Sequence, residues 1–168
     1  AIERGRQLRR DGADIIDIGA ESTHPDSTDV PVADEIAALT PVVTAFMRDR
    51  DAGPNGRPLI SVDTRKPEVM RAVLALGVDL INDVSGLRSA DAISALRDYD
   101  ARVIVMFSLD PSGRAKRAGH ATVDDIVGFL EERLAAIDAA GVARERIILD
   151  PGMGFFVGAE ADASFAAL

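Results

Sequence analysis

Short apolar runs alternate with amphipathic helical segments along nearly the whole of this 168-residue chain. The apolar runs predict strands at about 14–19, 58–63, 79–85, 102–107 and 146–150. Helical spacing predicts helices at about 32–50, 67–76, 90–99 and 122–140. Strict alternation of this kind is typical of βα units in a parallel sheet. It indicates an α/β fold, either a doubly wound sheet or part of a (β/α)₈ barrel, which needs about 250 residues when complete.

Several residues mark where the helices begin and end. Residues 1–10 have the pattern of a helix that Gly12 stops, and Gly141 closes the last predicted helix in the same way. Thr122 is placed to cap that last helix, and Pro67 suits a first helical turn. Pro41 lies inside a helical pattern, so we expect it to kink or split that helix. Both chain ends are abrupt, so we expect an internal piece of a longer protein.

Polar side chains stand at or near the carboxyl ends of several predicted strands, where apolar burial would not select them. Asp63, Asn82 and Asp150 are the clearest cases. Burying such groups unpaired costs a few kcal/mol, and ligands of parallel α/β proteins bind at these strand ends. A carboxylate can pair with two adjacent donors on a planar ring, and an amide supplies both a donor and an acceptor. The set predicts a site for a flat, nitrogen-rich molecule such as a pterin.

Other side chains at these ends point to structural roles. Alternation turns Asp83 away from Asn82, which favours a structural role for Asp83, and we favour the same for Asp17. The basic segment Arg114–Arg117 could attract diphosphate, although a solvated loop is the commoner meaning of such a cluster.

Composition excludes several classes of function. The net charge is −9 and no basic stripe is present, which argues against nucleic acid as a partner. Cysteine is absent, so disulfides and thiolate metal sites are excluded, and His24 and His120 have no metal-ligand spacing. No apolar run approaches the ~20 residues of a membrane span, and no signal peptide opens the chain. We therefore expect a soluble cytoplasmic protein without a membrane partner.

Four segments of the chain resemble, in the correct order, the signatures of the dihydropteroate synthase family. They are Gly-Ala-Asp-Ile-Ile-Asp-Ile-Gly-Ala-Glu-Ser-Thr-His-Pro at 12–25, Ile-Ser-Val-Asp-Thr at 60–64, Ile-Asn-Asp-Val at 81–84, and Ile-Leu-Asp-Pro-Gly-Met-Gly-Phe at 148–155. The resemblance implies one pterin-binding (β/α)₈ barrel domain over 1–168, incomplete at both ends and with about five βα units. It also implies condensation of 6-hydroxymethyl-7,8-dihydropterin diphosphate with p-aminobenzoate, in which diphosphate leaves with the help of Mg²⁺.

The resemblance also assigns roles to individual residues. It implies that Asp63, Asn82 and Asp150 hold the pterin, with Asp63 and Asp150 stabilising the positive charge that develops on its ring. Two groups of residues complete this assignment: Val84 and Met106 pack against the pterin, and Thr23, Pro25 and Phe155 border the aminobenzoate pocket. The metal ligand would lie outside this chain, and a homodimer is expected at full length.

The chain departs from the family pattern at several positions, which keeps other functions open. Ala20 replaces a glycine, His24 an arginine and Phe107 a histidine, while Phe156 and Val157 replace Gly-Lys. The family's first-strand Asn, seventh-strand Lys and eighth-strand Arg and His are not matched by any residue here. The alternatives are a pterin-binding methyltransferase domain that uses methyltetrahydrofolate, and a paralogue that binds pterin without turnover.

Overall fold

The structure is a computed structural model that describes residues 1–21, 28–49, 58–110 and 121–153. Its elements are α1 (Ile2–Arg10), β1 (Ile15–Gly19), α2 (Val32–Arg48), β2 (Leu59–Asp63), α3 (Pro67–Ala75), β3 (Leu80–Asp83), α4 (Ala90–Arg97), β4 (Arg102–Met106), α5 (Val123–Ala139), the 3₁₀ helix η1 (Arg144–Arg146) and β5 (Ile147–Asp150). The strands form one parallel sheet in the order β1-β2-β3-β4-β5. The predicted βα alternation is therefore confirmed.

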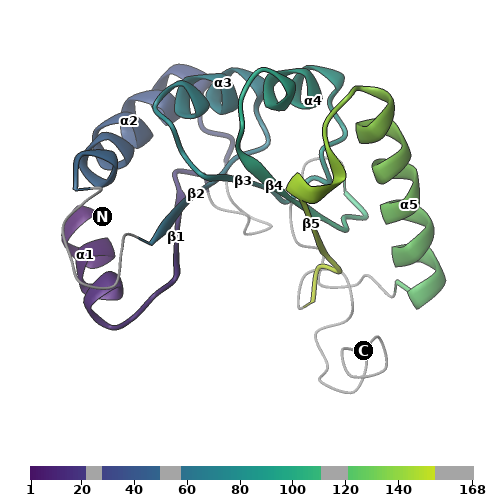
Figure 1. Ribbon diagram of the computed structural model, residues 1–168, viewed down its shortest axis with the longest axis horizontal. Coiled ribbons are helices and arrows are strands. Elements are labelled where there is room, and N and C mark those ends of the chain that lie inside the picture. Colours follow the sequence, from purple (N-terminus) through teal and green to yellow (C-terminus); the bar gives the residue numbers. More distant parts are fainter. Residues whose placement is uncertain (22–27, 50–57, 111–120, 154–168) are drawn as a thin grey trace.

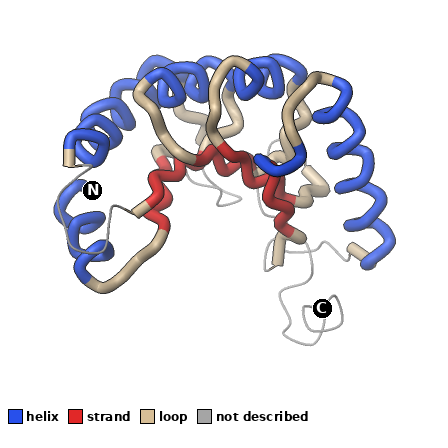
Figure 2. Tube along the Cα trace, viewed as in Figure 1, coloured by secondary structure: helices blue, strands red, loops and turns tan. Residues whose placement is uncertain are grey.

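The helices lie on one side of this sheet. Figures 1 and 2 show the strands on the inner side of an arc and helices α2 to α5 on its outer side. A doubly wound sheet carries helices on both faces and reverses its strand order, whereas a barrel adds strands in sequence and keeps its helices outside. The observed order and one-sided cover favour the barrel alternative.

The two faces of the sheet differ in burial. Residues that point toward the helices, such as Ile16, Ile60 and Val103, are buried in one hydrophobic core. Residues of the inner face are partly open within the described part of the chain, since Ile15 is 44 % exposed and Ile148 is 40 % exposed. In a closed barrel, side chains fill this interior. The strand register places Asp63, Asn82 and Asp150 on this inner face.

Most predicted helix boundaries are confirmed. Pro67 begins α3, and Thr122 caps α5 in a reciprocal capping box with Asp125. Gly12 and Gly141 adopt φ values of 95° and 83°, in the left-handed region where glycine ends a helix without strain. Gly5 has a different role, because a Cβ there would clash with the ring of Phe46 from α2.

Two predicted boundaries need correction. Pro41 does not split its helix, because α2 runs unbroken from Val32 to Arg48, while a kink at Pro41 stays a prediction. Pro41 itself is exposed, while Leu39 and Val43 on either side of it are buried, so packing holds the helix together despite the missing N–H. Strand β3 ends at Asp83, two residues earlier than expected, because the next residues form a turn.

Candidate functional site at the carboxyl end of the sheet

The strand register gathers the predicted pterin-binding residues at one end of the inner face. Asp63 pairs with Asn82 across β2 and β3, and Met106 pairs with Asp150 across β4 and β5. Asn82 pairs with Ile104, so Met106 lies two residues further along the same face. The four side chains therefore share one face and one edge of the sheet, and their contact with a ligand stays a prediction.

Asp63 is the most perturbed acid of this group. Burial, together with the negative charges of Asp17, Asp83, Glu35 and Glu21, raises its pKa to about 7. Within the described part of the chain, no side chain donates a hydrogen bond to its carboxylate. A carboxylate in this position gains stability from any ligand that brings donors or positive charge.

Asp17 lies closer to the site than the sequence suggested. Its Oδ2 accepts a hydrogen bond of 3.2 Å from Nδ2 of Asn82. A structural role was expected for Asp17, and its hydrogen bond to Asn82 places it beside the candidate site. The alternation of side chains along β1 could have revealed this position. Ile16 and Ile18 are buried on the helix side, so Asp17, which lies between them, faces the inner side of the sheet.

Asp83 faces away from the inner side, as expected, and organises the turn after β3. It is buried, and its Oδ1 accepts hydrogen bonds from the backbone N of Ser85 at 2.8 Å and from its Oγ at 2.6 Å. Burial raises the pKa of Asp83. In the same turn the buried Leu87 has a φ of 51°, which costs on the order of 1–3 kcal/mol and requires firm support from its surroundings.

An apolar wall borders the polar residues. Val84 and Met106 belong to one buried cluster with Phe107 and Ile126. The Phe107 ring meets Phe129 of α5 edge to face, with 5.3 Å between centroids. The two residues that were expected to pack against a pterin therefore belong to one apolar cluster, and the register places Met106 opposite Asp150.

A network of ion pairs, which was not predicted from the sequence, lies at the same end of β1 and β2. Lys66 Nζ donates to Glu21, to the carbonyl of Val30 at 2.6 Å and to Glu35 at 2.6 Å. Arg65 donates to Glu21 at 2.9 Å and to Asp29 at 2.8 Å.

The centre of this network is buried. The Glu35 side chain is 1 % exposed, and it also accepts a 2.7 Å hydrogen bond from Thr64 Oγ1. Glu35 stands four residues before Leu39 and eight before Val43, both of which are buried. This helical spacing was the signal that could have identified Glu35 as a buried charge with a partner.

Some predicted residues cannot be placed, and no metal centre is found among those that can. Thr23, Pro25 and Phe155 lie outside the described residues, as do His24, His120 and the segment 114–117. Across residues 1–21, 28–49, 58–110 and 121–153, no group of three or more His, Cys, Asp or Glu side chains could hold a metal ion. In the same residues, no helix is long and apolar enough to cross a membrane.

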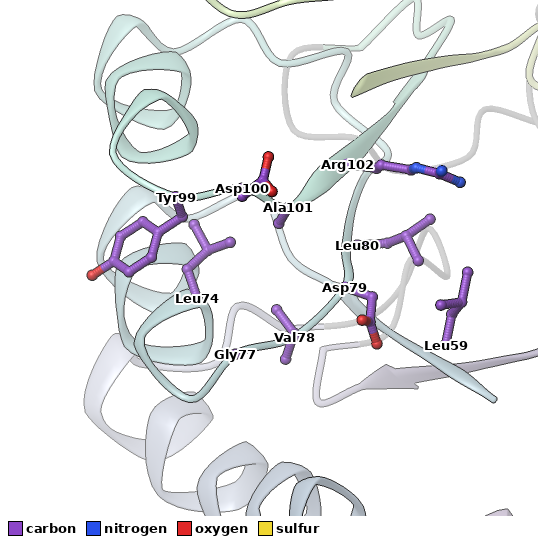
Figure 3. Close-up of a pocket in the computed structure, with 10 residues that line it drawn as sticks. All are labelled: Leu59, Leu74, Gly77, Val78, Asp79, Leu80, Tyr99, Asp100, Ala101 and Arg102. Carbon is purple, nitrogen blue, oxygen red and sulfur yellow. The ribbon is translucent and has the colours of Figure 1, made fainter. Parts of the chain in front are cut away.

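A pocket of about 550 Å³ lies at the opposite end of the sheet. Figure 3 shows Val78, Asp79 and Ala101 among its lining residues, close to the amino ends of β3 and β4. Asp79 Oδ2 accepts a 2.8 Å hydrogen bond from the backbone N of Ile60, which is a structural contact. The amino ends of barrel strands serve stability rather than chemistry, so this pocket is not the candidate site.

A known protein family and several curated proteins match this chain over all or nearly all of its length. The family described as pterin binding enzyme matches residues 1–168. Dihydropteroate synthase type-3 of Escherichia coli is 42 % identical over 171 residues, which cover 100 % of this chain and 62 % of that protein. Dihydropteroate synthase type-1 of Pseudomonas aeruginosa is 35 % identical over 161 residues, or 94 % of this chain and 55 % of that protein. The chain thus spans less than two thirds of the length of these relatives.

Solved structures agree with the sequence comparison. The dihydropteroate synthase of Burkholderia cenocepacia, complexed with 7,8-dihydropteroate, superposes with a TM-score of 0.84 at 40 % identity and covers 98 % of this chain and 57 % of its own. That of Xanthomonas albilineans with 4-aminobenzoic acid gives 0.79 at 38 % identity, over 92 % of this chain and 53 % of its own. The five strands and the helices between them therefore form part of a (β/α)₈ barrel.

Proposed function

This chain belongs to the family of pterin-binding enzymes, and we propose on that premise that the protein acts as a dihydropteroate synthase. The amine nitrogen of p-aminobenzoate would form a bond with the methylene carbon of 6-hydroxymethyl-7,8-dihydropterin diphosphate. The bond from that carbon to the diphosphate oxygen would break, diphosphate would leave with the bonding electrons, and the amine would lose one proton. We propose that residues 1–168 all belong to a single barrel domain of this enzyme, of which they form a part.

The observation that carries the proposal is the register that sets Asp63 beside Asn82 and Asp150 beside Met106 on one face. Asp63 and Asp150 would accept hydrogen bonds from the donor-rich edge of the pterin, while Val84 and Met106 would cover its apolar surface. As the diphosphate leaves, positive charge spreads into the ring, and the nearby carboxylates stabilise it without forming a covalent bond.

The remaining parts of the proposal concern groups beyond the described residues. Thr23, Pro25 and Phe155 are proposed to border the aminobenzoate. The described residues supply no set of ligands for the Mg²⁺ that would accompany diphosphate, so its ligands are proposed to lie elsewhere in the protein. The partners are small molecules, and we propose a cytoplasmic homodimer.

A direct test is the release of diphosphate by the whole protein in the presence of pterin diphosphate, with and without p-aminobenzoate. Release that depends on p-aminobenzoate supports the proposal. Pterin binding without release would indicate a non-catalytic paralogue, and transfer of a methyl group from methyltetrahydrofolate would indicate the methyltransferase alternative. Either result would overturn the proposed activity.

The Asp150→Asn variant tests the site itself. An amide presents a donor where the pterin edge also presents donors, so pterin binding should be lost. The matched control is Asp98→Asn, which removes the same charge from an exposed position at the end of α4. Unchanged pterin affinity in Asp150→Asn would remove Asp150 from the pocket.

A further inference from the structure

Asp17 and Asn82 form a hydrogen bond that spans a whole strand. Asp17 lies on β1 and Asn82 on β3, and β2 runs between them. The residue of β2 that pairs with Asp17 is Ser61, and the one that pairs with Asn82 is Asp63. The hydrogen bond therefore joins two inner-face side chains across β2, the strand that carries Asp63.

The chemistry of the two partners fixes how the amide is turned. An ionised carboxylate only accepts hydrogen bonds, whereas an amide carries a donor nitrogen at one end and an acceptor oxygen at the other. With Asp17 as its partner, Asn82 must direct Nδ2 toward β1. If the amide turned by 180°, Oδ1 would face the Asp17 oxygen and two acceptors would meet without a proton between them.

This orientation leaves a defined set of groups for a ligand. The second N–H of Asn82 and its Oδ1 remain available to a ligand, with the N–H on the side of β1 and the oxygen on the side away from it. Among the described residues, no group donates to Oδ1 of Asn82. A ring edge with an acceptor nitrogen beside an N–H group would match that order, and the reverse order would not.

We propose that Asp17 is a positioning residue, which holds the Asn82 amide in the orientation that recognises the pterin ring. This inference rests on the proposed function, because it names the residue that sets the hydrogen-bond order of the same site. Asp17 would act through Asn82 rather than on the ligand. Its loss should therefore weaken pterin binding only while Asn82 is present.

A double-mutant cycle on the whole protein tests this dependence. The dissociation constant of 6-hydroxymethyl-7,8-dihydropterin would be measured for the unchanged protein, Asp17→Ala, Asn82→Ala and the double variant. We expect Asp17→Ala to weaken binding about tenfold, which corresponds to ~1.4 kcal/mol, and to have no further effect in the Asn82→Ala background. An equal loss in both backgrounds, or no loss in either, would overturn the proposal.

The charge of Asp17 also raises the pKa of Asp63, so the two effects must be separated. Measurements at about pH 9, well above the raised pKa, keep Asp63 ionised in every variant. Asp17→Asn gives a second test there, because its amide oxygen can still accept from Asn82 while its own NH₂ group also permits the reversed order. Its affinity should lie between those of the unchanged protein and Asp17→Ala.

A ligand-free measurement distinguishes this proposal from the proposed function. In side-chain ¹⁵N–¹H spectra, the Asn82 NH₂ pair is identified by its absence in Asn82→Ala. One of its protons should shift upfield in Asp17→Ala, because it loses a carboxylate acceptor. If the protein fails to bind the dihydropterin but shows this shift, the proposed function fails and the positioning role stands. If the NH₂ pair is unmoved, the positioning role fails.

Discussion

Two groups of acidic side chains lie toward the carboxyl ends of β1 and β2, and they differ in whether a basic side chain among the described residues pairs with them. In the first group, which we term the ion network, Glu21 and Glu35 are paired with Lys66 and Arg65. In the second group, the inner-face acids Asp17 and Asp63, no described Lys or Arg forms an ion pair with either carboxylate.

The difference follows from what each group can gain on folding. Glu35 is almost fully buried, and a buried charge is tolerated only when an opposite charge and hydrogen bonds satisfy it. Asp63 has no cation as a partner among the described residues, and burial together with neighbouring negative charges raises its pKa. The ion network thus pairs its charges within the described residues, whereas Asp63 has no described cation as a partner, and we propose that a ligand interacts with it.

The ion network also has a mechanical consequence. Lys66 and Arg65 follow β2, and they hold Glu21 on one side and Asp29 and Val30 on the other side of the connection between β1 and α2. Both ends of that connection are therefore tied to the start of α3. Its residues 22–27 lie outside the described part of the chain.

Removing Lys66 should produce the largest loss of stability in this comparison. Lys66→Met leaves Glu35 buried with Thr64 as its remaining hydrogen-bond partner. Breaking a buried pair in this way costs about 3–5 kcal/mol, measured as the free energy of unfolding in urea. The double variant Lys66→Met with Glu35→Gln should recover part of the loss, because it removes the unpaired charge. A loss below about 1 kcal/mol would show that water satisfies Glu35.

The inner-face acids should respond in the reverse sense. Asp63→Asn removes a carboxylate that no described residue satisfies, so the free energy of unfolding at about pH 8 should stay equal or rise. Affinity for the dihydropterin should fall about a hundredfold, or ~2.7 kcal/mol, because a charged acceptor has become a neutral amide. Equilibrium binding and urea unfolding of the same variant check both parts. A loss of stability with retained affinity would make Asp63 a structural residue.

The positions of the inner-face residues could be predicted from the sequence, whereas the pairs of the ion network could not. The strands, the caps at Thr122 and Gly141, and the shared edge of Asp63, Asn82 and Asp150 were predictable because they depend on local periodicity and on the geometry of parallel sheets. Their ligand contacts stay predictions.

What the sequence missed depends on partners far away along the chain. Asn82 reaches Asp17 across 65 residues and Lys66 reaches Glu35 across 31, and no local pattern encodes either pair. The split expected at Pro41 is absent for a related reason, because buried neighbours in the folded protein outweigh the local preference of proline. The end of β3 depends on hydrogen bonds from Ser85 to Asp83 that strand periodicity does not report.

The two groups should also shape the pH dependence of stability in opposite directions. The raised pKa of Asp63 means that the folded protein keeps a proton that the unfolded chain releases above about pH 4. Its stabilising contribution is present below that pH and is lost as the pH rises through about 7. Burial alone would raise the pKa of Glu21, but hydrogen bonds from Lys66 and Arg65 outweigh it and lower that pKa, so Glu21 loses its contribution as the pH falls.

Urea unfolding from about pH 3 to pH 8 would measure these opposing slopes, since the slope from Glu21 lies below its ordinary pKa of 4.5. Each group changes the free energy of unfolding by at most ~1.4 kcal/mol per pH unit. Asp63→Asn should remove the decline between pH 4 and 7 and leave the acid side unchanged. If the decline persists in Asp63→Asn, another buried acid such as Asp83, whose pKa burial also raises, is responsible.

Arg65→Gln should cause the smallest loss of stability. It tests whether burial determines how much an ion pair of the ion network contributes to the free energy of unfolding. The Arg65 side chain is 24 % exposed and one of its partners, Asp29, is 68 % exposed, so water can replace these contacts. Glu21 would keep its bond to Lys66. We expect a loss of about 0.5–1 kcal/mol in urea unfolding and no change in dihydropterin affinity, because Arg65 donates to Glu21 and Asp29 rather than to the inner-face acids. A loss as large as that of Lys66→Met would mean that the ion network stabilises the protein as a unit. The contributions of its buried and exposed pairs to the free energy of unfolding would then not be additive.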